Sequence, residues 1–454
     1  MAIIQQIIFI AILAGVAWLM YQRIGIIGKT IRLGKEEDRT DQPSKRLSIM
    51  MRVAFGQKKM FDRPLIGVLH FAVYVGFILI NIEILEIVLD GILGTHRLFS
   101  AALSNFYAAL IGFFELLALA VLIACAIFLI RRSFLKVERF QPARHREMSG
   151  WPQLDGKLIL VFEIVLMIAI LTMNAADSAL QDLGSAHYPI TGDFLVSQWF
   201  KPLFAEWSEG TLIAYERLAW WIHILGIFIF AVYLTYSKHL HIALAFPNTY
   251  FSRLEPKGEM KNMPEITQEV KIMLGLDTQA GDTTVPERFG AKDVADLSWK
   301  NLMDAYSCTE CGRCTAACPA NITGKKLSPR KIMMDTRDRL EEVGRNMLAN
   351  NGEFVNDNKN LLGDYIIEEE ILACTTCNAC VQECPVLINP LDIILQLRRH
   401  KVMDEAHAPG SWNMMFQNLD TNQAPWKFSA NDRFNWASAV VDRGPENKST
   451  ESGI

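Results

Sequence analysis

Long apolar runs alternate with short polar loops over the first half of the chain, and polar residues dominate the second half. Five of these runs are long enough to cross about 30 Å of hydrocarbon as helices. The pattern predicts membrane spans at residues 2–20, 64–90, 104–130, 157–175 and 212–236. The first run does not resemble a signal peptide, because basic residues follow it instead of preceding it. The spans together predict a transmembrane domain over residues 1–245.

Basic residues are unevenly shared between the expected loops. Lys and Arg number eleven in residues 21–63 and six in residues 131–156, but one each in residues 91–103 and 176–211. Since cytoplasmic loops carry the excess of Lys and Arg, the N-terminus is expected outside and both basic loops inside. The fifth span then leads inward. This orientation predicts an integral protein of the cell (inner) membrane whose C-terminal half is cytoplasmic.

Three further regions are expected after the spans. Residues 246–300 form a polar connector, and residues 301–402 hold two cysteine clusters. Residues 403–454 contain three tryptophans among polar residues, which predicts a docking segment. The small polar residues from Gly444 onward predict a flexible tail.

Composition narrows the class of protein. The chain is 51% hydrophobic and 21% charged, which is too apolar for a wholly soluble protein and too polar for a wholly embedded one. A formal net charge of −4 argues against a nucleic-acid-binding protein. Nine cysteines in 454 residues are too sparse for a secreted disulfide scaffold, so clustered thiols point to metal.

Eight of the cysteines form two copies of the run C-x₂-C-x₂-C-x₃-C-P. This is the spacing of bacterial two-cluster ferredoxins, in which the fourth cysteine of each run binds the other cluster. It predicts two [4Fe–4S] clusters, one held by Cys308, Cys311, Cys314 and Cys384, and one held by Cys374, Cys377, Cys380 and Cys318. Structural zinc is the alternative, but zinc sites usually use two separated pairs of ligands.

The segment between the two cysteine runs is longer than in small ferredoxins. Ile332, Met333, Leu340 and Val343 recur at near-helical spacing and predict a helix over Pro329–Leu348. The expected fold class is therefore mainly α. A five-helix transmembrane bundle should precede a cytoplasmic, α-helical, two-[4Fe–4S] ferredoxin-like domain.

Histidines lie in two of the expected spans. His70 lies in the second span, His223 lies in the fifth, and His239 and His241 follow the fifth span closely. A lone intramembrane histidine can be a satisfied polar group between helices. Histidines on two spans instead favour the axial ligands of a b-type haem, because neutral imidazole suits iron. In one continuous helix, His223 and His241 would share a face about 27 Å apart and could not bind the same iron.

Four carboxylates also lie within apolar spans: Glu83, Glu86, Glu115 and Glu163. Buried carboxylates are costly in a membrane and often mark proton or quinol handling. The alternative is that each one reaches the end of its helix or bonds to a neighbouring helix. No Walker loop, Rossmann fingerprint or nucleophile triad is evident, so no catalytic residue is assigned.

Residues 217–250 resemble the last helix of the respiratory nitrate reductase gamma subunit, which has histidines at the positions of His223 and His241. The span around His70 resembles the second helix of that family, which has a further histidine where this chain has Ile80. The family's haem nearer the cytoplasm uses the residues matching His70 and His241, and its outer haem uses the other two. The resemblance implies one haem b, held by His70 and His241. The pair His70 and His223 is the alternative.

The whole chain resembles the membrane-bound, heterodisulfide-reductase-related iron–sulfur oxidoreductases, which join a gamma-like membrane domain to a two-cluster ferredoxin domain. The segments Leu327–Arg330, Ala373–Cys377 and Cys384–Val386 are typical of that family, as is the pair Arg398 and Arg399. Relatives usually continue into cysteine-rich domains with Cys-Cys-Gly motifs. This chain has no cysteine after Cys384.

The motifs and the resemblance imply the electron-transfer subunit of an oxidoreductase. Electrons would pass between the quinone pool, a haem b, two [4Fe–4S] clusters and a soluble partner. That partner could be a cysteine-rich (Cys-Cys-Gly) subunit, an electron-transfer flavoprotein or a dehydrogenase. Trp412, Trp426 and Trp436 would dock it, unless they cover the ferredoxin core. A haem-free membrane anchor that docks an iron–sulfur module is the alternative function.

Overall fold

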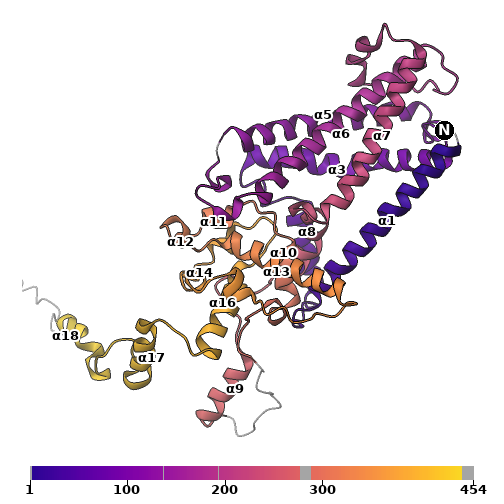
Figure 1. Ribbon diagram of the computed structural model, residues 1–454. Coiled ribbons are helices and arrows are strands. Elements are labelled where there is room, and N and C mark those ends of the chain that lie inside the picture. Colours follow the sequence, from indigo (N-terminus) through magenta and orange to yellow (C-terminus); the bar gives the residue numbers. More distant parts are fainter. Residues whose placement is uncertain (1–2, 136, 193, 277–287, 442–454) are drawn as a thin grey trace, which may run out of the picture.

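The computed structural model describes residues 3–135, 137–192, 194–276 and 288–441. Over these residues the chain is built from helices and loops, and two isolated backbone bridges are the sole β-type pairings (Figure 1). Five helices are long and apolar enough to cross a membrane: α1 (Ile3–Ile31), α3 (Pro64–Leu93), α5 (Asn105–Ser133), α6 (Trp151–Asp182) and α7 (Glu209–Leu234). The expected fold class, a five-helix bundle followed by a ferredoxin-like domain, is confirmed.

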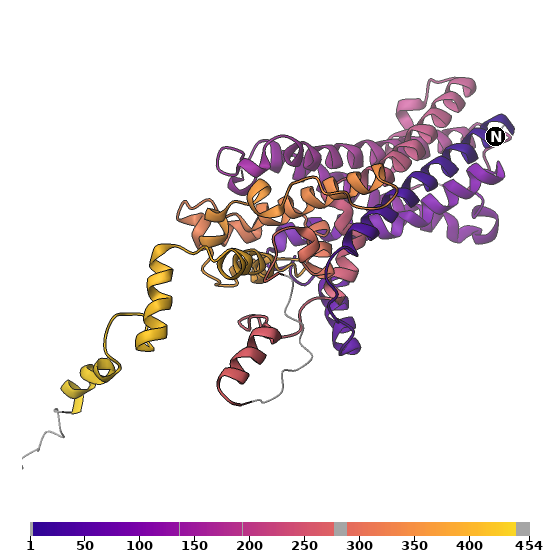
Figure 2. The same cartoon turned by 60° about the horizontal axis from the view of Figure 1, so that its bottom comes forward.

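Helices α3, α5, α6 and α7 lie side by side and α1 runs along them (Figures 1 and 2). Small residues let the helices approach closely, as is usual inside membranes. A Cβ atom on Gly76 would lie 2.4 Å from the Val121 side chain, and one on Gly226 would lie 2.7 Å from Leu166. The bundle core is therefore packed by close helix contact and by large apolar side chains such as Leu171.

Helix α1 extends well beyond the predicted span. Its last turns carry Ile26 and Ile27, which pack into the core of the C-terminal domain. The Thr30 hydroxyl lies 3.1 Å from the Tyr306 hydroxyl, and Arg23 forms an ion pair with Glu341 at 2.7 Å. One helix thus belongs to both parts of the molecule and fixes one against the other.

Helix α7 ends at Leu234, so His223 and His241 do not lie on one continuous helix. Ser237 has an extended backbone, a 3₁₀ turn spans Lys238–Leu240, and α8 (His241–Tyr250) follows. The shared helix face expected for the two histidines is therefore wrong. A polar break between α7 and α8 separates the two histidines. The Ser237 side chain stabilises this break by accepting a hydrogen bond from the His239 N–H.

The C-terminal domain is formed mainly by α10 (Trp299–Tyr306), α13 (Pro329–Ala349) and α16 (Pro390–Arg399). Short helices contain or flank the cysteine runs: α11 (Arg313–Ala316), α12 (Pro319–Ile322), α14 (Glu368–Leu372) and α15 (Ala379–Glu383). The helix predicted over 329–348 is confirmed as α13. Leu302, Ile332 and Ile394 are fully buried between the three main helices.

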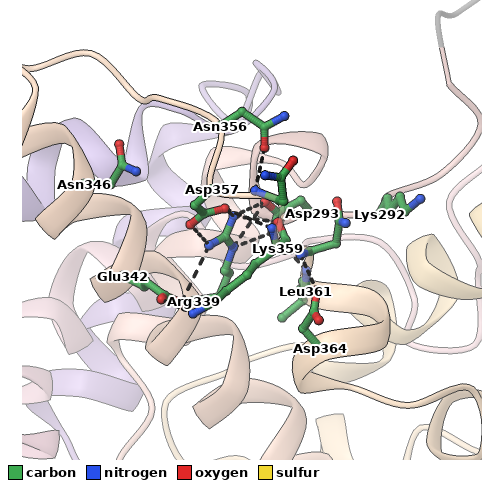
Figure 3. Close-up of polar contacts among 12 residues, drawn as sticks. Lys292, Asp293, Arg339, Glu342, Asn346, Asn356, Asp357, Lys359, Leu361 and Asp364 are labelled. Atoms are coloured by element: carbon green, nitrogen blue, oxygen red, sulfur yellow. Dashed lines mark hydrogen bonds and ion pairs between the residues drawn. The ribbon is translucent and has the colours of Figure 1, made fainter.

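A fully buried guanidinium fastens the segment between the cysteine runs to the rest of the domain. Arg339, on α13, donates to Asp293 at 2.7 Å, to Asp357 at 2.9 Å and to the Lys359 carbonyl at 2.8 Å (Figure 3). Buried arginine is tolerated where its donors are satisfied in this way. The contacts hold the loop after α13 against residues that precede α10.

The remaining helices lie outside these two cores: α2 (Pro43–Met50), α4 (Ser100–Leu103), α9 (Pro264–Met273), α17 (Gly410–Asn422) and α18 (Asn435–Val441). Helices α17 and α18 extend away from the body of the molecule (Figure 2). Trp426 and Trp436 are 68% and 70% exposed, whereas Trp412 is half-buried beside Arg398. Two of the three tryptophans therefore do not cover the ferredoxin core. The tail expected from Gly444 lies outside the described residues.

Candidate metal centres

The first cysteine run folds into a tight loop before a short helix. Cys308 follows α10, and Glu310 and Gly312 have positive φ angles of 51° and 72°. These left-handed residues turn the chain back on itself, which is costly for most side chains but not for glycine. Cys314 lies on α11, and Cys318 immediately precedes α12.

The second cysteine run repeats this geometry. Thr376 and Asn378 have φ angles of 56° and 60° at the positions that match Glu310 and Gly312. Cys380 lies on α15, and Cys384 caps its C-terminal end. The sequence repeat is therefore also a repeat of backbone structure.

The structure brings the last cysteine of the first run to the second run. Cys318, Cys374, Cys377 and Cys380 line one small pocket, whose other walls include Leu391 and Ile394. These four are the cysteines expected to share one cluster. Each cysteine is free, so its sulfur is available as a ligand.

Cys384 in turn lies among the cysteines of the first run. Burial raises the pKa of its thiol to about 12, and the neighbouring thiols of Cys311 and Cys308 contribute to that rise. Burial likewise raises the pKa of Cys308 to about 12. Iron binding at such sites must displace thiol protons, because the thiolate is the ligand.

Backbone N–H groups point at two of the sulfurs, and such hydrogen bonds help to set the potential of an iron–sulfur cluster. The Thr376 N–H donates to Cys374 Sγ at 3.4 Å, and the Ile388 N–H donates to Cys384 Sγ at 3.3 Å. Among the described residues, no three His, Cys, Asp or Glu side chains converge closely enough to share one metal ion. A cubane does not need that convergence, because each thiolate binds a different iron.

Sequence reasoning missed a buried carboxylate inside the first cysteine run. Glu310 accepts from Arg337 at 2.6 Å and forms an ion pair with Lys238, which comes from the turn after α7. Both Glu310 and Lys238 are buried. The signal available in the sequence was a carboxylate between two ligand cysteines, but its cationic partners are distant in the chain.

Three histidines gather where the bundle meets the first cysteine run. The rings of His239 and His241 are 5.7 Å apart, and His70 interacts electrostatically with His241 and with Arg313. The His241 Nδ1–H donates to the Lys238 carbonyl at 3.0 Å, so the lone pair available to a metal is the one on Nε2. Burial lowers the pKa of His241 and keeps its imidazole neutral, the form that binds iron.

Two of the candidate histidines have a buried ring nitrogen without a hydrogen-bond partner. These atoms are Nδ1 of His70 and Nε2 of His223. His223 donates through its other nitrogen to the Leu166 carbonyl at 3.0 Å, inside the apolar core of the bundle. The geometry therefore suits metal ligation by His223 as well as by His70 and His241.

The buried carboxylates at the other end of the bundle are bonded to neighbouring segments. Glu115 accepts from the Asn174 side chain at 3.1 Å and from the Val196 N–H at 2.8 Å. Glu86 accepts from the Tyr107 hydroxyl at 2.7 Å. These two residues therefore bond to neighbouring segments of the protein. Such a bond is the alternative to a role in proton or quinol handling.

Comparisons with known proteins agree with this geometry. Residues 307–388 match the family model of the 4Fe–4S dicluster domain. The chain is 30% identical over 443 residues to the probable iron–sulfur-binding oxidoreductase FadF of Bacillus subtilis, covering 91% of this chain and 58% of the relative. It is 26% identical over 424 residues to the EtfAB:quinone oxidoreductase of Syntrophomonas wolfei, covering 88% of this chain and 55% of the relative.

A shorter match links the chain to the heterodisulfide reductases. It is 32% identical over 107 residues to one of the subunits of the ferredoxin/F(420)H(2)-dependent CoB–CoM heterodisulfide reductase of Methanosarcina acetivorans, covering 24% of this chain and 52% of the relative. No solved structure matches the chain. The chain spans little more than half the length of the first two relatives.

The cysteine repeat, the apolar helices and these relatives agree with one another. The chain is a helical membrane protein with a 4Fe–4S dicluster domain, related to the iron–sulfur-binding oxidoreductases and to heterodisulfide reductase subunits.

Proposed function

We propose that this chain passes electrons between the quinone pool, one haem b and two [4Fe–4S] clusters, to or from a soluble redox partner. One observation carries the proposal. His70, His239 and His241 gather beside the first cysteine run, where Arg313 interacts with His70. Redox groups bound at these two sites would be neighbours, which electron transfer requires.

The proposed cluster ligands are those of the crossed pairing. Cys308, Cys311, Cys314 and Cys384 would hold the first cluster, and Cys374, Cys377, Cys380 and Cys318 the second. The pocket shared by Cys318 with the second run supports this pairing. When bound, the clusters supply one-electron carriers. The chain's own contribution is to bury four of the eight cysteines, Cys308, Cys318, Cys380 and Cys384, and to direct N–H groups at the sulfurs.

The proposed haem ligands are His70 and His241, with His223 as the alternative to His241. Support comes from the Lys238 carbonyl, which orients His241 and leaves its Nε2 free. Such a hydrogen bond to the far nitrogen is typical of metal-binding histidines. The unpartnered Nε2 of His223 is the reason to keep the alternative.

The quinone and the partner are proposed from the relatives. The EtfAB:quinone oxidoreductase suggests quinone as one substrate and an electron-transfer flavoprotein as donor. The heterodisulfide reductase subunit suggests assembly with other subunits, and a cysteine-rich (Cys-Cys-Gly) subunit or a dehydrogenase is a further candidate partner. Catalysis by this oxidoreductase would then require the partner.

The proposed organisation follows the expected boundaries. Residues 1–245 form a nitrate reductase gamma-like membrane domain, 246–300 a connector, 301–402 the two-cluster domain and 403–454 the docking segment. The N-terminus lies outside and the clusters lie in the cytoplasm. This orientation is supported by Arg330, which joins the iron–sulfur domain to the basic loop 131–156 through the Arg139 carbonyl at 2.6 Å.

Chemical analysis of the purified full chain, with optical spectra before and after reduction, tests this proposal. We expect about eight irons and eight sulfides from the clusters per chain, one further iron as haem, and a reduced b-type haem band. Clusters without haem, after expression with ample haem supply, would support the alternative of a haem-free anchor. Zinc without labile sulfide would contradict the cluster assignment.

A further inference from the structure

The two cysteine sites differ sharply in the charges that surround them. We propose that the first site has the higher reduction potential, so that electrons enter at the second site and move toward the membrane helices. The inference rests on the proposed cluster ligation. In the step itself, one electron leaves the reduced second cluster and reduces the oxidised first cluster, with no proton transferred.

Buried cations cluster around the first site. The Arg330 guanidinium is fully buried and packs on Gly312, where an added Cβ would lie 2.5 Å from its Nη1. Lys59 Nζ donates to the Cys384 carbonyl at 3.1 Å. Arg313, which is also buried, donates to the Lys59 carbonyl at 3.0 Å.

Two further basic residues complete this cationic shell. Arg139 interacts electrostatically with Cys311, and Arg337 interacts with Cys308. Two carboxylates oppose these cations: Glu310, which is paired with Arg337 and Lys238, and Glu147, which is paired with Arg330 at 2.8 Å. The net charge around the first site is therefore positive.

The second site has a different environment. The described residues that line its pocket are cysteines, prolines, leucines, an isoleucine, a threonine and an asparagine, with no charged side chain. One cation lies near it, because Arg398 donates to the Cys374 carbonyl at 2.8 Å. Cys377 is exposed, so a soluble molecule can approach this site directly.

An added electron is stabilised by nearby positive charge, and more strongly where water is excluded. Exposure of Cys377 works in the opposite sense, since water also stabilises the reduced form. Glu147 and Glu310 offset Arg330 and Arg337, which leaves Lys59, Arg313 and Arg139 acting at the first site against Arg398 at the second. Charge therefore outweighs solvation, and the first site is the stronger electron acceptor.

Redox titration of the full chain, monitored by electron paramagnetic resonance, tests the order of the two potentials. Arg337→Gln should lower the higher of the two midpoint potentials and leave the lower one unchanged. Arg398→Gln should lower only the lower potential. Arg345→Gln is the matched control, because this exposed arginine lies two turns further along α13 and should move neither.

If Arg398→Gln prevents folding, Asn378→Asp serves instead, since it adds a negative charge to the lining of the second pocket. It should also lower only the lower potential. A shift of the lower potential by Arg337→Gln would overturn the proposed order. Absence of two cluster signals from the unmodified chain would instead contradict the proposed function, so the two failures are distinguishable.

Discussion

At the scale of single residues, the left-handed residues inside each cysteine run set the direction in which the sulfurs point. Gly312 and Asn378 occupy matched positions with φ angles of 72° and 60°. Their surroundings differ, because Arg330 leaves no room for a side chain at Gly312. At Asn378, by contrast, a side chain is already accommodated.

This difference predicts unequal effects of alanine at the two positions. Asn378→Ala should cost about 1 kcal/mol, the usual penalty of a left-handed alanine. Gly312→Ala adds a clash with Arg330 Nη1 at 2.5 Å and should cost at least about twice as much. Thermal unfolding of the full chain measures both losses. Equal effects would contradict the role given to Arg330.

Serine substitutions test the crossed pairing of the cysteines. Cys308→Ser should impair the first cluster, whereas Cys318→Ser should impair the second although it lies in the first run. The reason is the pocket that Cys318 shares with Cys374 and Cys377. Cluster signals recorded by electron paramagnetic resonance would distinguish the two sites. Loss of the same cluster in both variants would show that each run binds its own cluster.

Alanine substitutions of single histidines test haem ligation. His70→Ala and His241→Ala should each abolish the reduced haem band and preserve the clusters. His187→Ala is the control, because this exposed histidine lies in a loop at the opposite end of the bundle. If His223→Ala removes the band and His241→Ala does not, the pair is His70 and His223.

The candidate site was predictable from sequence only where spacing along the chain determines it. Each cysteine run is a local motif, so its repeat and its loop geometry follow from consecutive residues. The partners of Glu310 could not be predicted in this way. Lys238 follows α7 and Arg337 lies on α13, so their contact depends on how the two domains pack.

A buried polar network joins individual helices at the end of the bundle that lies away from the iron–sulfur domain. Arg97, in the loop after α3, donates to Asp177 at 2.9 Å and to Asn174 at 2.7 Å on α6. Its backbone N–H donates to Asp90 at 2.8 Å. One residue therefore links the connecting loop to α3 and to α6.

Arg97→Met should strongly destabilise the chain, by about 3–5 kcal/mol, because it leaves buried carboxylates without their cation. Arg144→Met is the control. Arg144 pairs with Glu138, but both side chains are largely exposed, and such pairs contribute little. Thermal unfolding in detergent should show a large decrease for the first variant only. A similar small decrease for both would mean that the buried network is not required for stability.

The apolar helices were predictable as elements, but two of their ends were not. Hydropathy identifies an apolar run that is long enough to cross the membrane. It does not predict how far the helix continues into the core of a neighbouring domain. Helix α1 continues to Ile31 because Ile26 and Ile27 are covered by the second domain. Helix α7 stops at Leu234 because the polar turn at Ser237 is stabilised by hydrogen bonds to Asp155 and His239.

Contacts between the two parts of the whole molecule involve several separate segments of the membrane domain. Helix α1, the loop containing Lys59, the basic loop containing Arg139 and the turn containing Lys238 all contact the iron–sulfur domain. The histidine group lies at this same junction. The arrangement supports an electron path from one part of the molecule to the other.

Addition of a reduced quinol analogue to the oxidised full chain in lipid vesicles tests the proposed path most directly, by driving electrons along it in the reverse of the inferred direction. Under anaerobic conditions, optical and electron paramagnetic resonance spectra would follow the haem and the cluster with the higher potential. The account predicts that the haem band and the signal of that cluster appear together, and that His70→Ala abolishes both responses. Cluster reduction that persists at the same rate without haem would contradict a path through the histidine site.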